Sequence, residues 1–358
     1  MTALAVVAVI WLSGFLPVSH AQQPAPRAVP LPPATIATPP NPPAPPAPPP
    51  VPVLRFDAAL DSIVPPGATI ERVATGFGFV EGPVWSRGGT LIFSDIPANT
   101  IFSLGANGQT SVVNTPSGYT GSEPRAPGSH IGSNGLTIDR QGRLILCEHG
   151  DRRVTRLEAD GRHTILADRY DGKRLNSPND AVVKSDGSIY FTDPPYGLPK
   201  ADDDPAKELP HNGIYRIKDG KVELLSTALN RPNGIAFSPD ERTLYVANSD
   251  VMRRIWMRFD VKADGTLGEG RVFLDVTADS ATGIPDGLRV DSAGNLFATG
   301  PGGVWIVSPQ GKALGRIQPP EGPANVAFGE DGKTLFMTAR RSVYRIRLLT
   351  GGPRPAVD

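Results

Sequence analysis

The chain has 358 residues and no formal net charge, because 36 lysines and arginines balance 36 aspartates and glutamates. A neutral chain lacks the positive field that holds phosphate backbones, which excludes nucleic acid as a partner, and a single cysteine excludes an internal disulfide and a cysteine-ligated zinc cluster. Glycine and proline, at 39 residues each, indicate many short elements joined by tight turns, as is typical of an all-β domain.

Residues 1–21 are predicted to be a signal peptide. The apolar run Ala3–Val18 is followed by Ser19 and Ala21, two small residues that suit cleavage after Ala21. We therefore expect an exported protein, either periplasmic or secreted. Serine, glycine and proline interrupt the run, which is too short for a stable membrane span. No lysine or arginine precedes the run, so a leader that stays attached as an anchor is the alternative.

Residues 22–53 form a proline-rich segment after this leader. Proline recurs at nearly every second position between Pro24 and Pro52, which predicts a stiff polyproline II spacer with no core of its own. We interpret the segment as an inert linker; a stalk that tethers the domain near a membrane or binds a partner is the alternative. Residues 54–349 are the predicted globular domain, and residues 350–358 a C-terminal tail.

The predicted domain contains a pattern that recurs six times. Each copy begins with a polar residue that enters a short apolar run: Glu81–Trp85, Asn134–Asp139, Asn179–Val183, Asn233–Phe237, Asp286–Val290 and Asn325–Phe328. A second run follows: Leu91–Asp95, Leu144–Glu148, Ile189–Asp193, Leu244–Asn248, Leu296–Gly300 and Leu335–Ala339. Turn signals such as Ser185–Gly187 join the two runs, a third run follows in every copy, and a fourth follows in the first five. Four strands per copy, at a period of about 40–55 residues, predict a six-bladed β-propeller.

The sixth copy has no fourth run of its own. The segment Thr69–Ala74 precedes the first copy and has no other expected partner. We therefore predict that this N-terminal strand is the outer strand of the last blade, where it closes the ring and removes an exposed sheet edge.

The residue that enters each first run carries a side-chain oxygen. These residues are Glu81, Asn134, Asn179, Asn233, Asp286 and Asn325. The first strand of each propeller blade lines the central axis, so the six side chains should converge. Each one alone could be a turn residue, but carboxylates buried together without a cation are costly. The set therefore predicts an oxygen site for one divalent metal ion, which suits Ca²⁺, Mg²⁺ or Mn²⁺ better than a histidine-ligated Zn²⁺.

Four longer motifs carry a resemblance to a known family. They are Glu81–Trp85, Asn176–Asp180 together with Tyr190–Gly197, Arg231–Gly234 and Pro285–Gly287. They resemble the gluconolactonase branch of the senescence marker protein/gluconolactonase/luciferin-regenerating enzyme family. The likeness covers the chain from about Ile70 to Leu348.

The resemblance implies a six-bladed propeller that hydrolyses a sugar lactone, an aldono-1,4- or 1,5-lactone such as gluconolactone, with one divalent metal ion. By motif, the metal ligands are Glu81, Asn179, Asn233 and Asp286. Ca²⁺ is the favoured ion, with Mg²⁺, Mn²⁺ and Zn²⁺ as alternatives. Asn134 is not among the family's four ligands, and we expect it to contact substrate or bound water. Ser177 stands where the animal branch has a substrate-contacting arginine, so substrate preference cannot be transferred.

The mechanism that we expect follows from the Lewis acidity of the divalent metal ion. The metal polarises the lactone carbonyl, water attacks it, and Asp286 is the candidate general base, with no covalent intermediate. We expect His149 and Asp180 to contact the substrate. Asp180 is also a candidate for orienting the metal ligands, as is Asp193, and a simple turn or strand-end role is the alternative for both.

Two other functions stay open from the sequence. The same metal could hydrolyse a phosphorus ester or another activated ester, because both reactions develop negative charge on an oxygen. The propeller could also be a non-catalytic ligand-binding module with a structural calcium, because a fold alone does not establish a function.

Overall fold

The computed structural model describes residues 52–123, 126 and 128–352. The chain divides into residues 1–48 and residues 49–358, and every element given below belongs to the second unit. The predicted signal peptide and nearly all of the predicted spacer lie outside the described residues. In the part of the chain that is described, no helix has the length and apolar character needed to cross a membrane.

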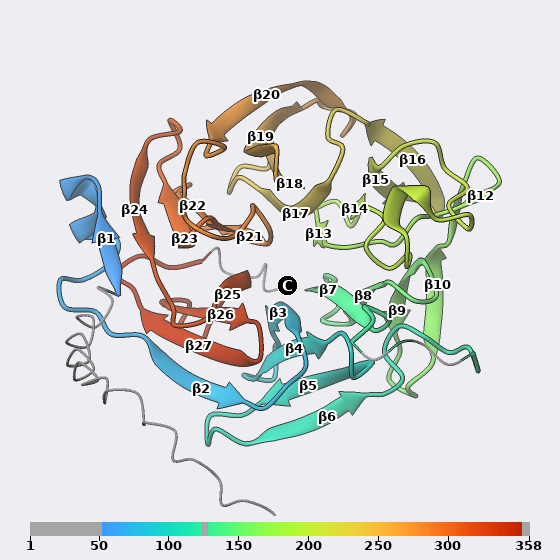
Figure 1. Cartoon of the computed structure of the whole chain (residues 1–358), viewed down its shortest axis with the longest axis horizontal. Coiled ribbons are helices and arrows are strands. Elements are labelled where there is room, and N and C mark those ends of the chain that lie inside the picture. Colours follow the sequence, from blue (N-terminus) through green and yellow to red (C-terminus); the bar gives the residue numbers. More distant parts are fainter. Residues whose placement is uncertain (1–51, 124–125, 127, 353–358) are drawn as a thin grey trace, which may run out of the picture. The chain divides into compact units, whose positions relative to one another are not determined.

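The second unit is a six-bladed β-propeller, as predicted, with its blades arranged around one axis (Figure 1). The first blade consists of β3 (Val80–Trp85), β4 (Leu91–Asp95), β5 (Thr100–Leu104) and β6 (Thr110–Asn114). The second consists of β7 (Ser133–Ile138), β8 (Leu144–Glu148), β9 (Arg153–Leu157) and β10 (His163–Ala167). The third consists of β13 (Ala181–Val183), β14 (Ile189–Asp193), β15 (Gly213–Lys218) and β16 (Lys221–Ser226).

The remaining blades follow the same antiparallel order. The fourth consists of β17 (Pro232–Phe237), β18 (Thr243–Asp250), β19 (Arg253–Val261) and β20 (Leu267–Asp275). The fifth contains β21 (Leu288–Val290), β22 (Leu296–Gly300), β23 (Gly303–Val307) and β24 (Ala313–Ile317). The sixth contains β25 (Pro323–Gly329), β26 (Thr334–Ala339) and β27 (Ser342–Arg347), with β2 (Glu71–Thr75) outermost, so that Glu71 lies opposite Arg345.

Local sequence explains the blades. Tight turns join consecutive strands, as between β13 and β14, where Gly187 has a φ of 86° and its N–H bonds to the carbonyl of Lys184 at 2.9 Å. Strands β8 and β22 are buried along their whole length, because each blade packs against a neighbour on both faces. This double burial accounts for the nearly unbroken apolar runs in the sequence.

The innermost strands of neighbouring blades contact each other around the whole ring. These strands are β3, β7, β13, β17, β21 and β25, which surround the centre of the view in Figure 1. The first residues of these strands therefore meet at one end of the axis. We call the six residues Glu81, Asn134, Asn179, Asn233, Asp286 and Asn325 the hub.

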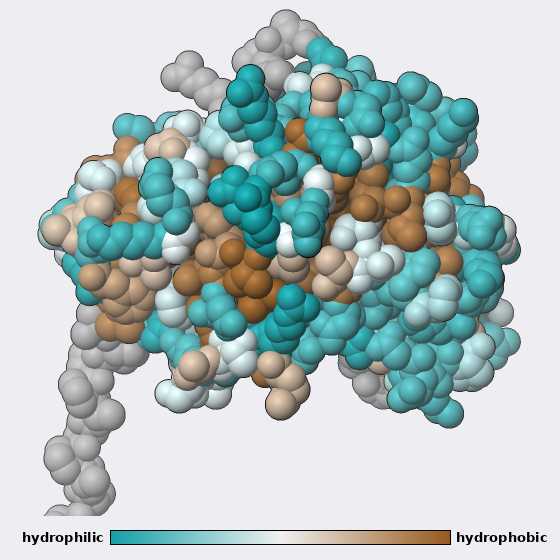
Figure 2. Space-filling model, turned by 90° about the horizontal axis from the view of Figure 1, so that it is seen from above, coloured by the Kyte–Doolittle hydropathy of each residue, from teal (hydrophilic) through white to brown (hydrophobic). Residues whose placement is uncertain are grey.

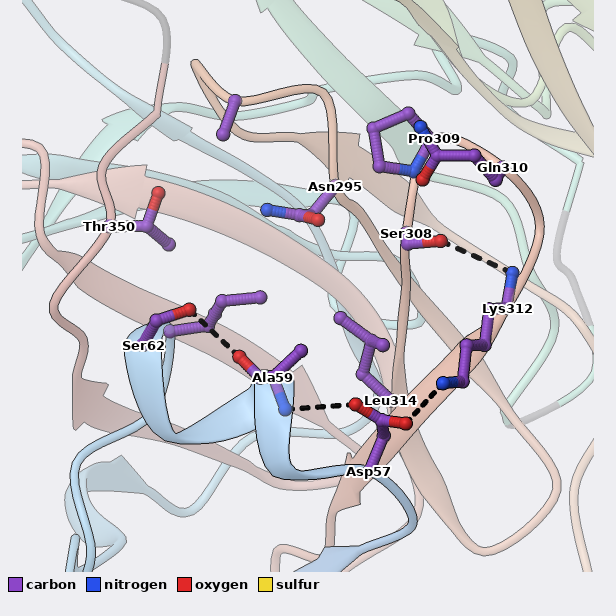
Figure 3. Close-up of a pocket in the computed structure, with 12 residues that line it drawn as sticks. Asp57, Ala59, Ser62, Asn295, Ser308, Pro309, Gln310, Lys312, Leu314 and Thr350 are labelled. Atoms are coloured by element: carbon purple, nitrogen blue, oxygen red, sulfur yellow. Dashed lines mark hydrogen bonds and ion pairs between the residues drawn. The ribbon is translucent and has the colours of Figure 1, made fainter.

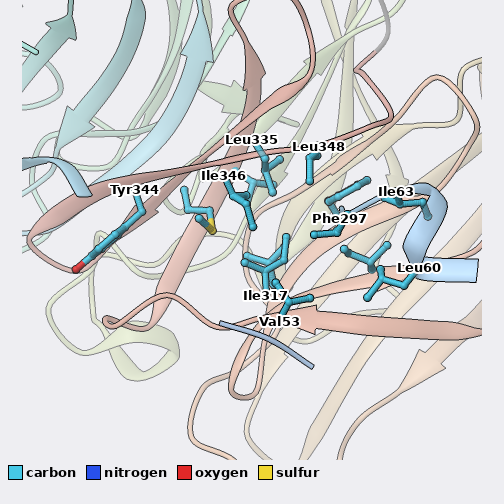
Figure 4. Packing of buried hydrophobic residues seen from close by; sticks show 14 of the residues in the cluster. Val53, Leu60, Ile63, Phe297, Ile317, Leu335, Tyr344, Ile346 and Leu348 are labelled. Carbon is cyan, nitrogen blue, oxygen red and sulfur yellow. The ribbon is translucent and has the colours of Figure 1, made fainter. Parts of the chain in front are cut away.

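An N-terminal segment extends the fifth blade in a way that the sequence did not predict. Strand β1 (Val53–Arg55) pairs antiparallel with β24 as a fifth strand. The 3-10 helix η1 (Ala58–Ser62) follows it, and the carboxylate of its N-cap residue Asp57 accepts the N–H of Ala59 at 2.9 Å. Leu60 of η1 is fully buried in the apolar cluster between the fifth and sixth blades, which also contains Ile317 (Figure 4).

Replacing Leu60 by alanine is expected to lower the free energy of unfolding by about 2–5 kcal/mol, because it leaves a cavity in this cluster. Urea denaturation followed by circular dichroism measures the change. Leu349→Ala is the matched control, since Leu349 is 49% exposed, and should cost well under half as much. Equal losses in the two variants would mean that η1 does not contribute to the core.

The other described elements lie in connections and on the outside. A short hairpin of β11 (Arg169–Tyr170) and β12 (Lys173–Arg174) precedes the third blade, and the 3-10 helix η2 (Ala201–Asp203) lies in the long loop after β14. Figure 2, viewed at right angles to Figure 1, shows hydrophobic groups among hydrophilic ones on the surface. The exposed apolar residues include Val112, Ile165 and Val272, which lie on outer strands.

Candidate functional site

The six hub residues occupy equivalent positions in the six blades. Glu81, Asn134, Asn233 and Asn325 are among the first residues of β3, β7, β17 and β25, and Asn179 and Asp286 stand two residues before β13 and β21. Five of the six are buried, whereas Asp286 is partly exposed. The register between the two inner strands shifts near the hub residue in the first, second, fourth and sixth blades. Irregular pairing of this kind re-aims side chains, here at the start of the innermost strands.

Glycines next to hub residues let the innermost strands approach closely. The N–H of Gly135 donates to the carbonyl of Asn179 in the next blade at 2.7 Å, and a Cβ on Gly135 would lie 2.5 Å from that oxygen. A Cβ on Gly287 would lie 1.9 Å from Cγ of Asn325. The Asn-Gly and Asp-Gly pairs in the sequence are therefore needed for packing at the hub, where any larger residue would collide.

The hub carboxamides form a directional chain of hydrogen bonds. Asn134 Nδ2 donates to Asn179 Oδ1 at 2.9 Å, Asn179 Nδ2 donates to Asn233 Oδ1 at 2.5 Å, and Asn233 Nδ2 donates to Ser249 Oγ at 2.8 Å. Asn134 Oδ1 is buried and has no hydrogen-bond partner among the described residues. The chain fixes the orientation of each amide and leaves an unsatisfied oxygen at one end.

Two hub carboxylates lie in an enclosed environment. Glu81 Oε2 accepts the N–H of Gly82 at 2.7 Å and Asn325 Nδ2 at 3.0 Å. Burial raises the pKa of Glu81 to about 7, although these donors oppose the shift. The pKa of Asp286 is raised well above its ordinary value, first by burial of the carboxyl group and then by the charges of Glu81 and Asp180. The two carboxylates are therefore close enough to repel each other.

A third carboxylate and a guanidinium also reach the hub. Asp180 follows Asn179 and is fully buried, and its Oδ2 lies 3.5 Å from Nη1 of Arg289, three residues beyond Asp286. Burial raises the pKa of Asp180, and Arg289 opposes this shift. Both residues also act electrostatically on Glu81. The sequence indicated a role for Asp180 but not for Arg289.

The donor set at the hub fits one hard divalent cation. The hub region contains three carboxylates and one guanidinium, which leaves an excess of two negative charges when all four groups are ionised. Such an excess is unfavourable in a buried site without a counter-ion. Within the described residues, no group of three or more His, Cys, Asp or Glu side chains is arranged to hold a metal ion, so a cation here would also need the carboxamide oxygens.

The segment that leads into Asn179 is held by Asp193. Its two carboxylate oxygens accept the backbone N–H groups of Asn176 and Ser177, both at 2.8 Å, and burial raises its pKa to about 7. The hydroxyl of Ser177 donates to the carbonyl of Pro194 at 2.6 Å. Asp193 thus supports the turn that positions Asn179 and Asp180, and Ser177 is part of this turn.

Aromatic rings lie beside the hub carboxamides. His149 is fully buried, and its Nε2 lies 3.2 Å from Asn179 Oδ1. His130 stacks on His149 with ring centroids 6.5 Å apart, and Phe79 stacks on His130 at 5.3 Å. Burial lowers the pKa of His149 to about 3, so its ring is neutral, and its Nδ1 has no partner among the described residues. The sequence did not single out Phe79.

A surface pocket of about 370 Å³ lies elsewhere (Figure 3). Its lining residues Ala293 and Asn295 follow β21, whereas Asp286 precedes that strand. The pocket is bounded by η1, by the turns after β21 and β23 and by Thr350. Its charged groups are already paired, because Lys312 forms an ion pair with Asp57 and Ser308 Oγ accepts the N–H of Lys312 at 3.3 Å. The ion pair between Lys312 and Asp57 therefore holds the N-terminal segment against the fifth blade. Among the residues that line the pocket, no set of unpaired catalytic groups converges.

Comparisons with known proteins show what this chain is similar to. Residues 79–341 match the family described as SMP-30/Gluconolactonase/LRE-like region. A gluconolactonase from Zymomonas mobilis subsp. mobilis is 38% identical over 311 residues, covering 84% of this chain and 87% of that protein. A solved gluconolactonase structure from Xanthomonas campestris has a TM-score of 0.72 and 34% identity, covering 83% of this chain and 95% of the other. The diisopropyl-fluorophosphatase of Loligo vulgaris is 25% identical over 278 residues, covering 72% of this chain and 84% of that enzyme.

Proposed function

Because the chain belongs to the SMP-30/gluconolactonase/LRE-like family, we propose that it hydrolyses a sugar lactone at the hub to the corresponding hydroxy acid. The substrate class is an aldono-1,4- or 1,5-lactone such as gluconolactone. One observation carries the proposal: side chains with oxygen donors from all six blades meet at the hub. They leave two negative charges in excess when Glu81, Asp180, Asp286 and Arg289 are all ionised, which suits one divalent cation.

We assign the cation, with Ca²⁺ favoured, to Glu81, Asn179, Asn233 and Asp286. When bound, such an ion supplies a Lewis acid that polarises the lactone carbonyl and offsets the negative charge that develops on its oxygen. The neighbouring amides keep the donors in position. Asn325 holds Glu81, and Asn134 holds Asn179, through the hydrogen bonds described above.

Asp286 is assigned as the general base. It is the one hub residue that is partly exposed, and its carboxyl group lies within the hub, inside the electrostatic reach of Glu81 and Asp180. The oxygen of a water molecule bonds to the carbonyl carbon while a proton of that water passes to Asp286. The bond between the carbonyl carbon and the ring oxygen then breaks, the ring oxygen takes the proton back from Asp286, and the hydroxy acid leaves without ever being bonded to the protein.

His149 and Asn134 are assigned as contacts of the sugar or of bound water. Each has a buried polar atom without a partner among the described residues, Nδ1 in His149 and Oδ1 in Asn134. Asn134 Oδ1 accepts a hydrogen bond, and His149 Nδ1 does so when Nε2 carries the ring proton and donates it to Asn179 Oδ1. A hydroxyl group or a water molecule would therefore satisfy both atoms.

The experiment is a lactone-opening assay on the purified chain, in which proton release from gluconolactone is followed above the spontaneous rate. We expect catalysis that is lost after chelation and dialysis and restored by Ca²⁺. Full activity in a sample free of divalent metal would remove the metal from the mechanism. If no lactone in a panel of aldonolactones is opened, the proposal of lactone hydrolysis fails, and the candidates left are phosphorus-ester hydrolysis and a binding role.

A second candidate reaction is hydrolysis of a phosphorus ester. The similarity to the diisopropyl-fluorophosphatase favours it, and the same hub charges suit both reactions. The values of kcat/KM for a lactone and for a fluorophosphate, measured on one preparation, decide between them.

A further inference from the structure

The ion pair between Asp180 and Arg289 crosses the hub. Asp180 precedes the innermost strand of the third blade, and Arg289 lies in that of the fifth, so the two residues come from blades that are not neighbours. Their side chains are 1% and 21% exposed and approach to 3.5 Å. Arg289 Nη1 also donates to the carbonyl of Leu288 at 2.7 Å, which anchors the guanidinium. A positive charge is thus fixed among the innermost strands.

Blades that contribute a carboxylate alternate around the hub with blades that contribute only a carboxamide. Glu81, Asp180 and Asp286 come from the first, third and fifth blades, and the second, fourth and sixth contribute the carboxamides of Asn134, Asn233 and Asn325. The three carboxylates come from different blades, and the charge of Asp180 acts on both of the others. The negative charge of Asp180 and the positive charge of Arg289 therefore both contribute to the electrostatic field at the proposed metal site.

We propose that Arg289 is a built-in counter-cation that cancels the charge of Asp180 and so adjusts the hub to one divalent cation. This inference rests on the proposed function, which places the cation at Glu81 and Asp286. Arg289 is a positioning residue here, because it acts through Asp180 and the field at the hub. Without Arg289 the hub would hold three uncompensated carboxylates and attract a cation more strongly. Without Asp180, Arg289 would repel the cation.

The opposite signs of these two effects distinguish charge balance from a merely structural ion pair. If the pair only holds two blades together, either single substitution disturbs the same geometry, and both should weaken cation binding or both leave it unchanged. If the pair balances charge, the two substitutions should shift the dissociation constant for Ca²⁺ in opposite directions, and their combination should cancel.

The test is calorimetric titration of Ca²⁺ into the metal-free full chain and its variants. Arg289→Met is expected to lower the Kd by about tenfold, and Asp180→Asn to raise it by about tenfold. The double variant should return to within about threefold of the parent. Arg143→Met is the matched control, because it breaks an arginine–aspartate pair with Asp139 away from the hub, and should leave the Kd unchanged. Arg289→Lys keeps the charge if the methionine variant does not fold, and should bind Ca²⁺ like the parent.

Shifts of the same sign in both single variants, or no shift in either, would overturn the inference while leaving the proposed metal site intact. A tenfold or larger change in Arg289→Lys would also overturn it. A parent protein that binds no divalent cation would instead contradict the metal site itself, and the inference would fall with it.

Discussion

Replacing Asp286 by asparagine is expected to lower kcat/KM for lactone opening by about a thousandfold or more, while the propeller stays folded. Asparagine has nearly the same shape but cannot accept a proton from water at neutral pH. It also removes one of the negative charges that we assign to the metal site. Steady-state kinetics on gluconolactone, with circular dichroism as the check on folding, measures the effect.

Asp279→Asn is the control for this variant. Asp279 lies in the same connection between β20 and β21, where its carboxylate pairs with Arg316 at 3.2 Å. Its kcat/KM should stay within about threefold of the parent. Near-normal catalysis by Asp286→Asn would remove Asp286 from the proton transfer.

Replacing Glu81 by glutamine should weaken Ca²⁺ binding by about a hundredfold or more, with a parallel loss of activity at limiting Ca²⁺. The amide oxygen of glutamine can still accept the N–H of Gly82 and the amide of Asn325, so packing is largely kept. The lost property is the negative charge. Calorimetric titration measures the affinity directly, independently of catalysis.

Glu321→Gln is the matched control for Glu81→Gln. Glu321 also accepts hydrogen bonds within the protein, from the N–H of Arg341 and the hydroxyl of Tyr344, each at 2.9 Å, but it does not belong to the hub. Its substitution should leave the Kd for Ca²⁺ unchanged. If Glu81→Gln binds Ca²⁺ as tightly as Glu321→Gln does, Glu81 is not a ligand.

The sequence was sufficient to predict the blades because most strands of a blade are consecutive in the chain and joined by short turns. The exceptions are β2 in the sixth blade and the long loop between β14 and β15 in the third. Asp-Gly pairs and apolar runs therefore predict turns and strand pairings between segments that are close in the sequence. The positions of the hub residues follow from the same repeat, because the entry to each first strand occupies the same place in every blade. The resemblance to the family then selected four of the six hub residues as the proposed metal ligands.

Contacts that depend on the closed ring could not be predicted in this way. Asp180 and Arg289 are 109 residues apart in the chain. They belong to the third and fifth blades, which are separated by the fourth. Strand β1 has only three residues and begins at Val53, the last residue of the predicted spacer, so no alternation of polar and apolar residues marks it. Export, cleavage after Ala21 and the role of the spacer stay predictions, since those residues lie outside the described chain.

The position of a bound calcium ion is the most direct measurement. We expect the anomalous diffraction of a crystal grown with Ca²⁺ to show one ion at the hub, with oxygens of Glu81, Asn179, Asn233 and Asp286 at about 2.3–2.6 Å. An empty hub at saturating Ca²⁺, or an ion bound elsewhere while Glu81 and Asp286 turn away from each other, would contradict the proposed site.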